Sequence, residues 1–140
     1  MEKMRMMLVD DEEGFLSTTK RLLERKGLHV TTAASGHEAL EKLTAESIHV
    51  VILDVKMPGM DGVATLKAIK SAYPLVQVVM LTGHGTVESA LEGLRSGATD
   101  YMMKPVDIDE LIAKAEEAFT RGQIMEEKIR VAEGKTADKK

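Results

Sequence analysis

Short apolar runs alternate with longer amphipathic stretches along the chain, and no other feature of the sequence limits its fold as much. Each run has the length of a β-strand, and each following stretch repeats apolar residues at the spacing of an α-helix. Strands that alternate with helices imply a parallel sheet with right-handed crossovers and helices on both of its faces. We therefore expect an α/β fold with strands at residues 5–9, 28–33, 50–53, 77–81 and 100–103.

Local signals mark where helices begin and which strand is central. Ser35 and Glu38 fit a capping box, in which each side chain accepts a hydrogen bond from the other residue's backbone N–H. Asp107 and Glu110 fit an Asp version of the same box. The run at residues 50–53 is apolar throughout, which is typical of a central strand that is buried on both faces.

The core is expected to consist of aliphatic and methionine side chains, because the sequence has ten Met but only two Phe, two Tyr and no Trp. In the helix expected at about residues 86–95, helical spacing turns Ala90, Leu91 and Leu94 toward this core.

Composition excludes several classes of protein. The 140 residues suit one domain, and the absence of cysteine excludes disulfides, thiolate zinc sites and a cysteine nucleophile. The net charge of −4 gives no basic excess for nucleic-acid binding, and the longest apolar run is too short to cross a bilayer. Because the N-terminus has no signal-peptide pattern, we expect a cytoplasmic protein that makes no direct contact with nucleic acid or a membrane.

We expect the folded domain to cover residues 1–121. Residues 122–140 are polar and mostly charged, with a few apolar residues between 124 and 131 that would extend the last helix by two turns. The remainder has the composition of a disordered tail or the stump of a linker.

Chemically active side chains stand directly after four of the expected strands: Asp10 and Asp11, Asp54, Thr82, and Lys104. The carboxyl ends of parallel strands share one edge of the sheet, which is where ligands bind in open α/β folds. Any one of these residues by itself is commonly a helix cap, a turn residue or a solvated side chain. Their joint occurrence, each after a strand predicted on other grounds, favours a single site.

Three clustered carboxylates repel one another, and they all stay ionised only if a cation offsets their charge. Because the ligands are oxygens and no His or Cys ends a strand, the cation favoured is a hard one, Mg²⁺ in a cell. Such a site suits a phosphoryl group, with Lys104 as a point charge on its oxygens and the Thr82 hydroxyl as a donor. Asp54 is the natural nucleophile, because it stands alone after the central strand.

These residues resemble those of response-regulator receiver domains of two-component signalling. The motifs are the acid pair Asp10-Asp11, VILDVKMPGMDG around Asp54, MLTGHG around Thr82 and GATDYMMKP, which contains Lys104. The resemblance covers about residues 4–120 and implies a flavodoxin-like (βα)5 fold with strand order 2-1-3-4-5. The stretch from Thr82 to Pro105 is similar to receivers of the NtrC-like branch, which regulate σ54-type transcription.

The resemblance implies that Asp54 accepts a phosphoryl group from a phosphohistidine of a histidine kinase. It implies Mg²⁺ bound by Asp11, Asp54 and the backbone carbonyl of Lys56, with Asp10 in support, mainly through water. A domain of this kind is not an enzyme in the usual sense, because it catalyses only its own phosphorylation and dephosphorylation.

The resemblance also implies a switch. Phosphorylation draws the Thr82 hydroxyl toward the phosphate and lets Tyr101 rotate inward, which remodels the face formed by the last two helices and the strand at residues 100–103. Output, expected to be transcription, would pass through a C-terminal domain, a downstream partner or a homodimer formed by that face. We hypothesise that Lys56 and His84 set the phosphoryl lifetime; a solvated lysine and a turn histidine are equally good readings.

Two other functions compete on the same scaffold. A phosphohydrolase similar to haloacid dehalogenases needs a second aspartate two residues after the nucleophile, and Lys56 stands there. A flavin or nucleotide carrier needs a loop after the first strand that cradles phosphate. Residues 10–13 are all acidic and would repel a phosphate unless a metal intervened.

Overall fold

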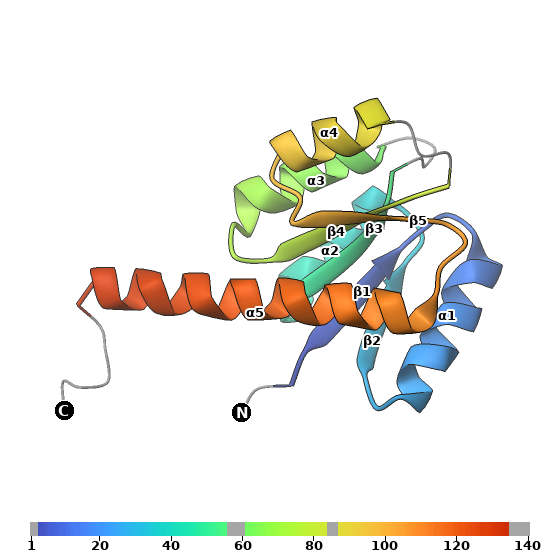
Figure 1. Ribbon diagram of the computed structural model, residues 1–140, viewed down its shortest axis with the longest axis horizontal. Coiled ribbons are helices and arrows are strands. Elements are labelled where there is room, and N and C mark those ends of the chain that lie inside the picture. The colour runs from blue at the N-terminus through green and yellow to red at the C-terminus, as the bar shows by residue number, and fades with distance from the viewer. Residues whose placement is uncertain (1–2, 56–60, 84–86, 135–140) are drawn as a thin grey trace.

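The computed structural model describes residues 3–55, 61–83 and 87–134, and a five-stranded parallel sheet lies at their centre (Figure 1). The strand order is β2-β1-β3-β4-β5, and each neighbouring pair is parallel. The predicted α/β class and strand order 2-1-3-4-5 are therefore confirmed. The strands are β1 (Arg5–Val9), β2 (His29–Ala33), β3 (Val50–Asp54), β4 (Gln77–Thr82) and β5 (Asp100–Met103).

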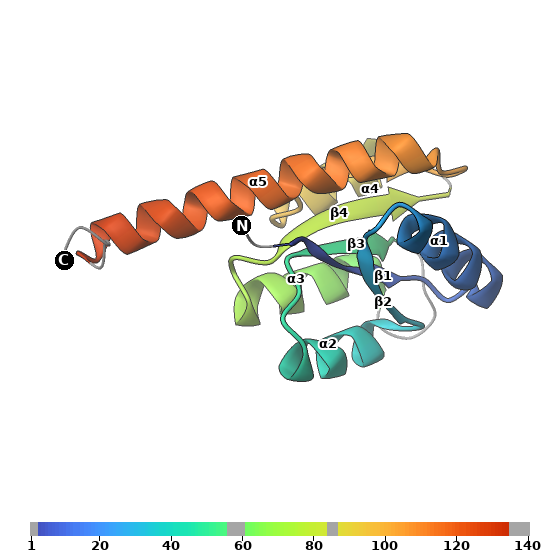
Figure 2. The ribbon, with the colours of Figure 1, turned by 90° about the horizontal axis from the view of Figure 1, so that it is seen from below.

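Helices cover both faces of the sheet. Successive strand residues point to opposite sides, so the apolar side chains of the strands form a core on both faces. Met7 and Val9 of β1 pack with α2 and α3, whereas Met6 and Leu8 pack with α1 and α5. Figure 2 shows α5 on one side of the sheet and α2 and α3 on the other. The helices are α1 (Glu13–Arg25), α2 (Gly36–Ala45), α3 (Gly62–Ala72), α4 (Val87–Arg95) and α5 (Ile108–Ala132).

The central strand β3 is buried along its whole length, as its apolar sequence predicts. It includes Asp54, and β4 includes Thr82, so each strand runs one residue further than its apolar run. Asp54 pairs with Leu81, and Thr82 pairs with Met103. Both polar side chains are therefore positioned by the hydrogen-bonded ladder of the sheet rather than by a loop.

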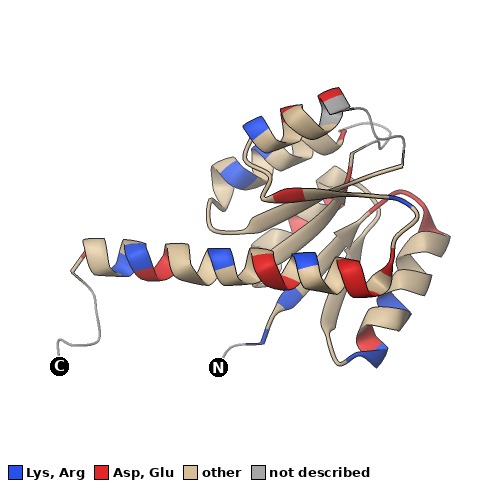
Figure 3. Cartoon of the chain, in the orientation of Figure 1, with Lys and Arg blue, Asp and Glu red and all other residues tan. Residues whose placement is uncertain are grey.

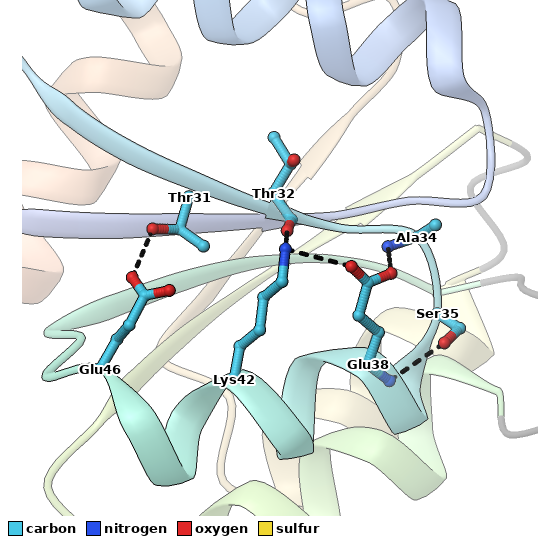
Figure 4. Close-up of polar contacts among 7 residues, drawn as sticks. All are labelled: Thr31, Thr32, Ala34, Ser35, Glu38, Lys42 and Glu46. Atoms are coloured by element: carbon cyan, nitrogen blue, oxygen red, sulfur yellow. Dashed lines mark hydrogen bonds and ion pairs between the residues drawn. The ribbon is translucent and has the colours of Figure 1, made fainter.

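The two predicted capping boxes have different outcomes. The Ser35 hydroxyl accepts a hydrogen bond from the Glu38 N–H (3.1 Å), as predicted, but the Glu38 carboxylate accepts from the Ala34 N–H (2.7 Å) rather than from that of Ser35 (Figure 4). The Asp107 side chain makes no capping hydrogen bond, so the box predicted there is wrong. The backbone carbonyl of Asp107 accepts a hydrogen bond from the Leu111 N–H at 2.9 Å, and this backbone contact begins the helix.

Side chains of α2 protect the outer edge of the sheet, which β2 forms (Figure 4). The Ala33 carbonyl accepts a hydrogen bond from the Asp10 N–H, directly after β1. Successive carbonyls of a strand point in opposite directions, so the Thr32 carbonyl faces the open edge, where the Lys42 ammonium donates to it. The Thr31 hydroxyl donates to Glu46 at 2.7 Å. Such contacts block the pairing with other chains that exposed edge strands invite.

Helix α4 does not pack as its sequence predicts. Ala90 is buried, but Leu91 and Leu94 are 42% and 38% exposed, so the prediction that both leucines face the core is wrong. The helix approaches the sheet through Gly93, where an added Cβ would lie 3.2 Å from the Met80 Cγ. This close approach fixes the rotation of α4 and turns its leucines outward.

Helix α5 is the longest element and extends beyond the sheet, with acidic and basic residues distributed along it (Figures 1 and 3). It continues to Ala132, 11 residues or about three turns past residue 121, so the helix is longer than the two added turns predict. The division of the chain at residue 121 stays a prediction, and residues 135–140 lie outside the described ranges. Within those ranges, no helix combines the length and the apolar character that a membrane span requires.

Candidate functional site

Three carboxylates meet at the carboxyl ends of β1 and β3. One carboxylate oxygen from each of Asp10, Asp11 and Asp54 lies within 4.8 Å of the other two. The register that pairs Val9 with Leu53 places the residues that follow them, Asp10 and Asp54, side by side. Asp10 is 1% exposed and Asp54 is 5% exposed, whereas Asp11 faces solvent.

Asp10 is held at both carboxylate oxygens. Its Oδ1 accepts from the Glu12 N–H (2.9 Å), and its Oδ2 accepts from the Lys104 ammonium (2.7 Å). The Asp10 N–H donates to the Ala33 carbonyl at 3.1 Å. A buried charge needs such compensation, and the lysine supplies it from a segment 94 residues away in the sequence.

Among the described residues, Lys104 is the cation that pairs with these acids. Its Nζ lies 2.7 Å from Asp10 and 3.1 Å from Glu12, and 4.5 Å from the centroid of the Phe15 ring. Burial by itself lowers the pKa of Lys104, but hydrogen bonds to Asp10 and Glu12 and the nearby charges of Asp10 and Asp54 outweigh it and raise this pKa above its usual value. Lys104 therefore stays an ammonium at neutral pH.

Thr82 lies at the same edge of the sheet as the acids and is 5% exposed. The Lys104 N–H donates to the Thr82 carbonyl at 2.8 Å, which joins the ends of β4 and β5. A Cβ added to Gly83 would lie 3.7 Å from the Lys104 Cδ, so the backbone after Thr82 packs against the lysine side chain.

The start of α3 is fixed against the end of β3. The Gly62 N–H donates to the Val55 carbonyl at 2.9 Å, and the Asp61 side chain caps the helix by accepting from the Ala64 N–H at 2.8 Å. A Cβ on residue 62 would lie 2.5 Å from the Val55 Cα and would also overlap the Asp54 carbonyl oxygen. The residue at this position must therefore be glycine for the two backbones to approach so closely.

The structure brings Asp10, Asp11, Asp54 and Lys104 into one cluster with Thr82 at the same edge, as the strand ends predict. Tyr101 lies on the edge strand β5 and is 40% exposed. The predictions for Lys56 and His84 fall on residues outside the described ranges.

Sequence reasoning did not single out Glu12, Phe15 and Gly62. The signals that could have found them are the third acid in the run after β1, an aromatic residue one helical turn further on, and the Asp-Gly pair at the start of α3. Each of these patterns is common in proteins. Only the folded structure shows that Glu12 and Phe15 contact Lys104 and that Gly62 lies against the end of β3.

The donor set fits a divalent cation. Among the residues that the structure describes, the three carboxylates carry three negative charges, the Glu12 carboxylate adds a fourth, and the Lys104 ammonium offsets one of them. Carboxylate oxygens are the ligands that Mg²⁺ prefers. Both Asp10 oxygens already accept hydrogen bonds, so a cation held by Asp10 would share these oxygens with the Glu12 N–H and the Lys104 ammonium.

Comparison with known proteins identifies the family. The model of the response regulator receiver domain matches residues 6–116, and the chain belongs to this family. It is 40% identical over 116 residues to the DNA-binding transcriptional regulator NtrC of Klebsiella pneumoniae, covering 83% of this chain and 25% of that protein. It is 41% identical over 113 residues to the transcriptional regulatory protein ZraR of Escherichia coli K12, covering 81% of this chain and 26% of that protein.

Solved structures agree with this assignment. NtrX from Brucella abortus in complex with ADP superposes with a TM-score of 0.86 at 32% identity, covering 93% of this chain and 30% of that chain. A CheY-like receiver domain protein from Methanospirillum hungatei JF-1 has a TM-score of 0.83 at 31% identity, covering 89% of this chain and 99% of that chain.

The predicted receiver domain with NtrC-like relatives is therefore confirmed, and the chain spans about a quarter of the length of the curated relatives it matches. Accepting a phosphoryl group at an acidic pocket that binds Mg²⁺ is the general role of this family, and a receiver domain is not a classical enzyme.

Proposed function

We propose that Asp54 accepts a phosphoryl group from a phosphohistidine of a histidine kinase, and that this loading switches the domain between two states. The observation that carries the proposal is the position of Asp54: it ends the central strand, is buried, and lies in a cluster with Asp10 and Asp11. The Lys104 ammonium, bonded to Asp10, supplies the positive charge that a phosphoryl group needs.

The proposed transfer forms one bond and breaks one. A carboxylate oxygen of Asp54 attacks the phosphorus, the N–P bond of the phosphohistidine breaks, and an acyl phosphate forms. The departing imidazole keeps the electron pair of that bond and takes a proton from water. Because the bond that breaks is already reactive, the protein mainly supplies position and electrostatic stabilisation.

The proposed Mg²⁺ ligands are Asp11, Asp54 and the backbone carbonyl of Lys56, with Asp10 in support. When bound, the ion would offset the charge of the carboxylates and of the phosphoryl oxygens. The exposed Asp11 and the buried Asp54 are adjacent but differ in access to solvent, which suits an ion that keeps several waters.

The proposed switch involves Thr82 and Tyr101. Thr82 would donate its hydroxyl to the phosphoryl group, and Tyr101 would turn from the surface toward the space that Thr82 leaves. The face of α4, β5 and α5 suits such a change, because large apolar side chains besides Tyr101 are exposed on two of these elements: Leu91 and Leu94 on α4 and Met103 on β5. Lys56 and His84 would set the lifetime of the phosphoryl group.

We propose transcriptional control as the output, because NtrC and ZraR are transcriptional regulators about four times as long as the matched segment. Residues 1–121 would form the receiver unit, and residues 122–140, which include the last part of α5, would lead toward an output domain or a partner. The face of α4, β5 and α5 would also support a homodimer.

Incubation with acetyl phosphate and Mg²⁺ tests the proposal. We expect alkali-labile labelling that reaches one phosphoryl group per chain and is abolished in Asp54→Asn and Asp54→Ala. Asp109→Asn is the matched control, because Asp109 is exposed, pairs with Lys26 and is not one of the clustered carboxylates. Sustained donor hydrolysis far beyond one equivalent would indicate a phosphohydrolase instead, and labelling that survives in Asp54→Asn would refute the assignment of the acceptor.

A further inference from the structure

The Lys104 ammonium already makes three contacts in the described site. Two of its N–H groups are directed to carboxylates, Asp10 at 2.7 Å and Glu12 at 3.1 Å, and the ammonium also lies over the Phe15 ring. An ammonium has three donors. At most one of them is left for a phosphoryl group on Asp54, and the ammonium can move fully toward that group only if one of its present contacts weakens.

The two carboxylate partners of Lys104 differ in how easily they can release it. Asp10 is 1% exposed, so without the lysine its charge would be buried with less compensation. The Glu12 side chain is 67% exposed, so water replaces the lysine there at small cost. Glu12 is therefore the partner that exchanges.

We propose that Glu12 is a positioning residue that holds the Lys104 ammonium in the unphosphorylated site and competes with the phosphoryl group for it. This inference rests on the proposed function of Asp54, which it deepens. Glu12 is well placed for the role because it is the N-cap residue of α1, and its own N–H donates to Asp10. Its backbone is thus fixed while its side chain stays in contact with water.

The competition predicts that loss of the Glu12 charge favours the loaded state. Glu12→Gln keeps the length of the side chain but removes its charge, so Lys104 is released more easily. Exposed ion pairs are worth about 0.2–1 kcal/mol, which corresponds to binding of a phosphoryl mimic that is about 1.4- to 5-fold tighter. Beryllofluoride with Mg²⁺ is a suitable mimic, and fluorine NMR reports its binding without a need for turnover.

Glu13→Gln is the matched control. Glu13 is the next residue, is exposed and has the same charge, but among the described residues the carboxylate partners of Lys104 are Asp10 and Glu12. A general effect of one lost negative charge would appear in both variants and would fade with added salt. The inference requires the dissociation constant for beryllofluoride to fall further in Glu12→Gln than in Glu13→Gln.

A second comparison asks whether the effect acts through the lysine. In a Lys104→Met background, Glu12→Gln should change beryllofluoride affinity no more than Glu13→Gln does. If Lys104→Met does not fold, as judged by circular dichroism, the comparison of the two single variants decides alone.

Equal affinities in Glu12→Gln and Glu13→Gln, or weaker binding in Glu12→Gln, would overturn the role of Glu12. Failure of the wild-type chain both to bind beryllofluoride and to be labelled by acetyl phosphate would instead overturn the proposed function itself. The two failures are therefore distinguishable.

Discussion

Replacing Gly62 by alanine tests how tightly the structure joins the phosphoacceptor strand to α3. The new Cβ would lie 2.5 Å from the Val55 Cα and 2.7 Å from the Val55 carbonyl oxygen, and it would overlap the Asp54 carbonyl as well. These neighbours are backbone atoms of a central strand and its exit, so no side chain can rotate away to relieve the contacts. The start of α3 and the end of β3 must separate.

Ordinary carbon contacts lie near 3.5–4.0 Å, so the separation needed is roughly 1 Å. Overpacking of this kind typically costs about 1–3 kcal/mol, and the backbone origin of the contacts places Gly62→Ala toward the upper end. The helix propensity of alanine returns less than about 1 kcal/mol. We therefore expect a net loss of about 2 kcal/mol in the free energy of unfolding, together with slower labelling of Asp54 because its strand end is displaced.

Urea denaturation measures this loss as a fall in midpoint at constant slope. Gly14→Ala is the matched control: Gly14 lies in the first turn of α1 with nothing within 4 Å of an added Cβ. The same change there should stabilise the chain by about 0.5–1 kcal/mol, because alanine has less backbone freedom to lose. Equal stability of Gly62→Ala and wild type, with unchanged labelling, would refute the reasoning.

Three further predictions concern charge. Asp11→Asn should weaken Mg²⁺ binding, and wild-type affinity in an Asp11→Asn, Asp54→Asn double variant would contradict the proposed ligands. Lys104→Arg should impair switching, measured as the phosphorylation-induced change in NMR shifts around Tyr101, because a planar fork replaces a point charge. The pKa of Glu38 is lowered, first by the hydrogen bond from the Ala34 N–H and then by Lys42. Glu38 therefore adds stability above the pKa of about 4.5 of the unfolded chain, and this stability is lost as the pH falls through the lower folded pKa. Glu38→Gln should then lose less stability than wild type between pH 7 and pH 3 in urea titrations.

The sequence predicts the sheet well because its strands carry their own signals. An apolar run such as residues 50–53 is too short for a typical helix and is characteristic of a buried strand. Alternation with helices makes the sheet parallel, so that the polar residue after each run reaches one edge. This is why Asp10, Asp54 and Lys104 could be expected to meet although they are far apart in the chain.

The errors concern side-chain contacts that depend on the packing of neighbouring elements. Periodicity turns Leu91 and Leu94 inward, but the close approach of Gly93 to Met80 rotates α4 away from that orientation. The contact of Glu12 with Lys104 joins residues 92 positions apart, and no local pattern distinguishes Glu12 from its acidic neighbours. Packing and long-range ion pairs therefore need the structure.

The adjacent acids Asp10 and Asp11 show how the fold divides one charged motif into different tasks. Asp10 points into the protein, where the Glu12 N–H and the Lys104 ammonium occupy both of its oxygens, and it thereby ties α1 to the end of β5. Asp11 is exposed and shares the cluster with Asp54, so water has access to the carboxylate that would exchange it for a metal. If Asp54 carries a phosphoryl group as we propose, the added negative charge acts directly on Lys104, the cation that joins these elements. A local charge change at β3 can therefore reach β5 and the face around Tyr101 through a single side chain, without a longer chain of contacts.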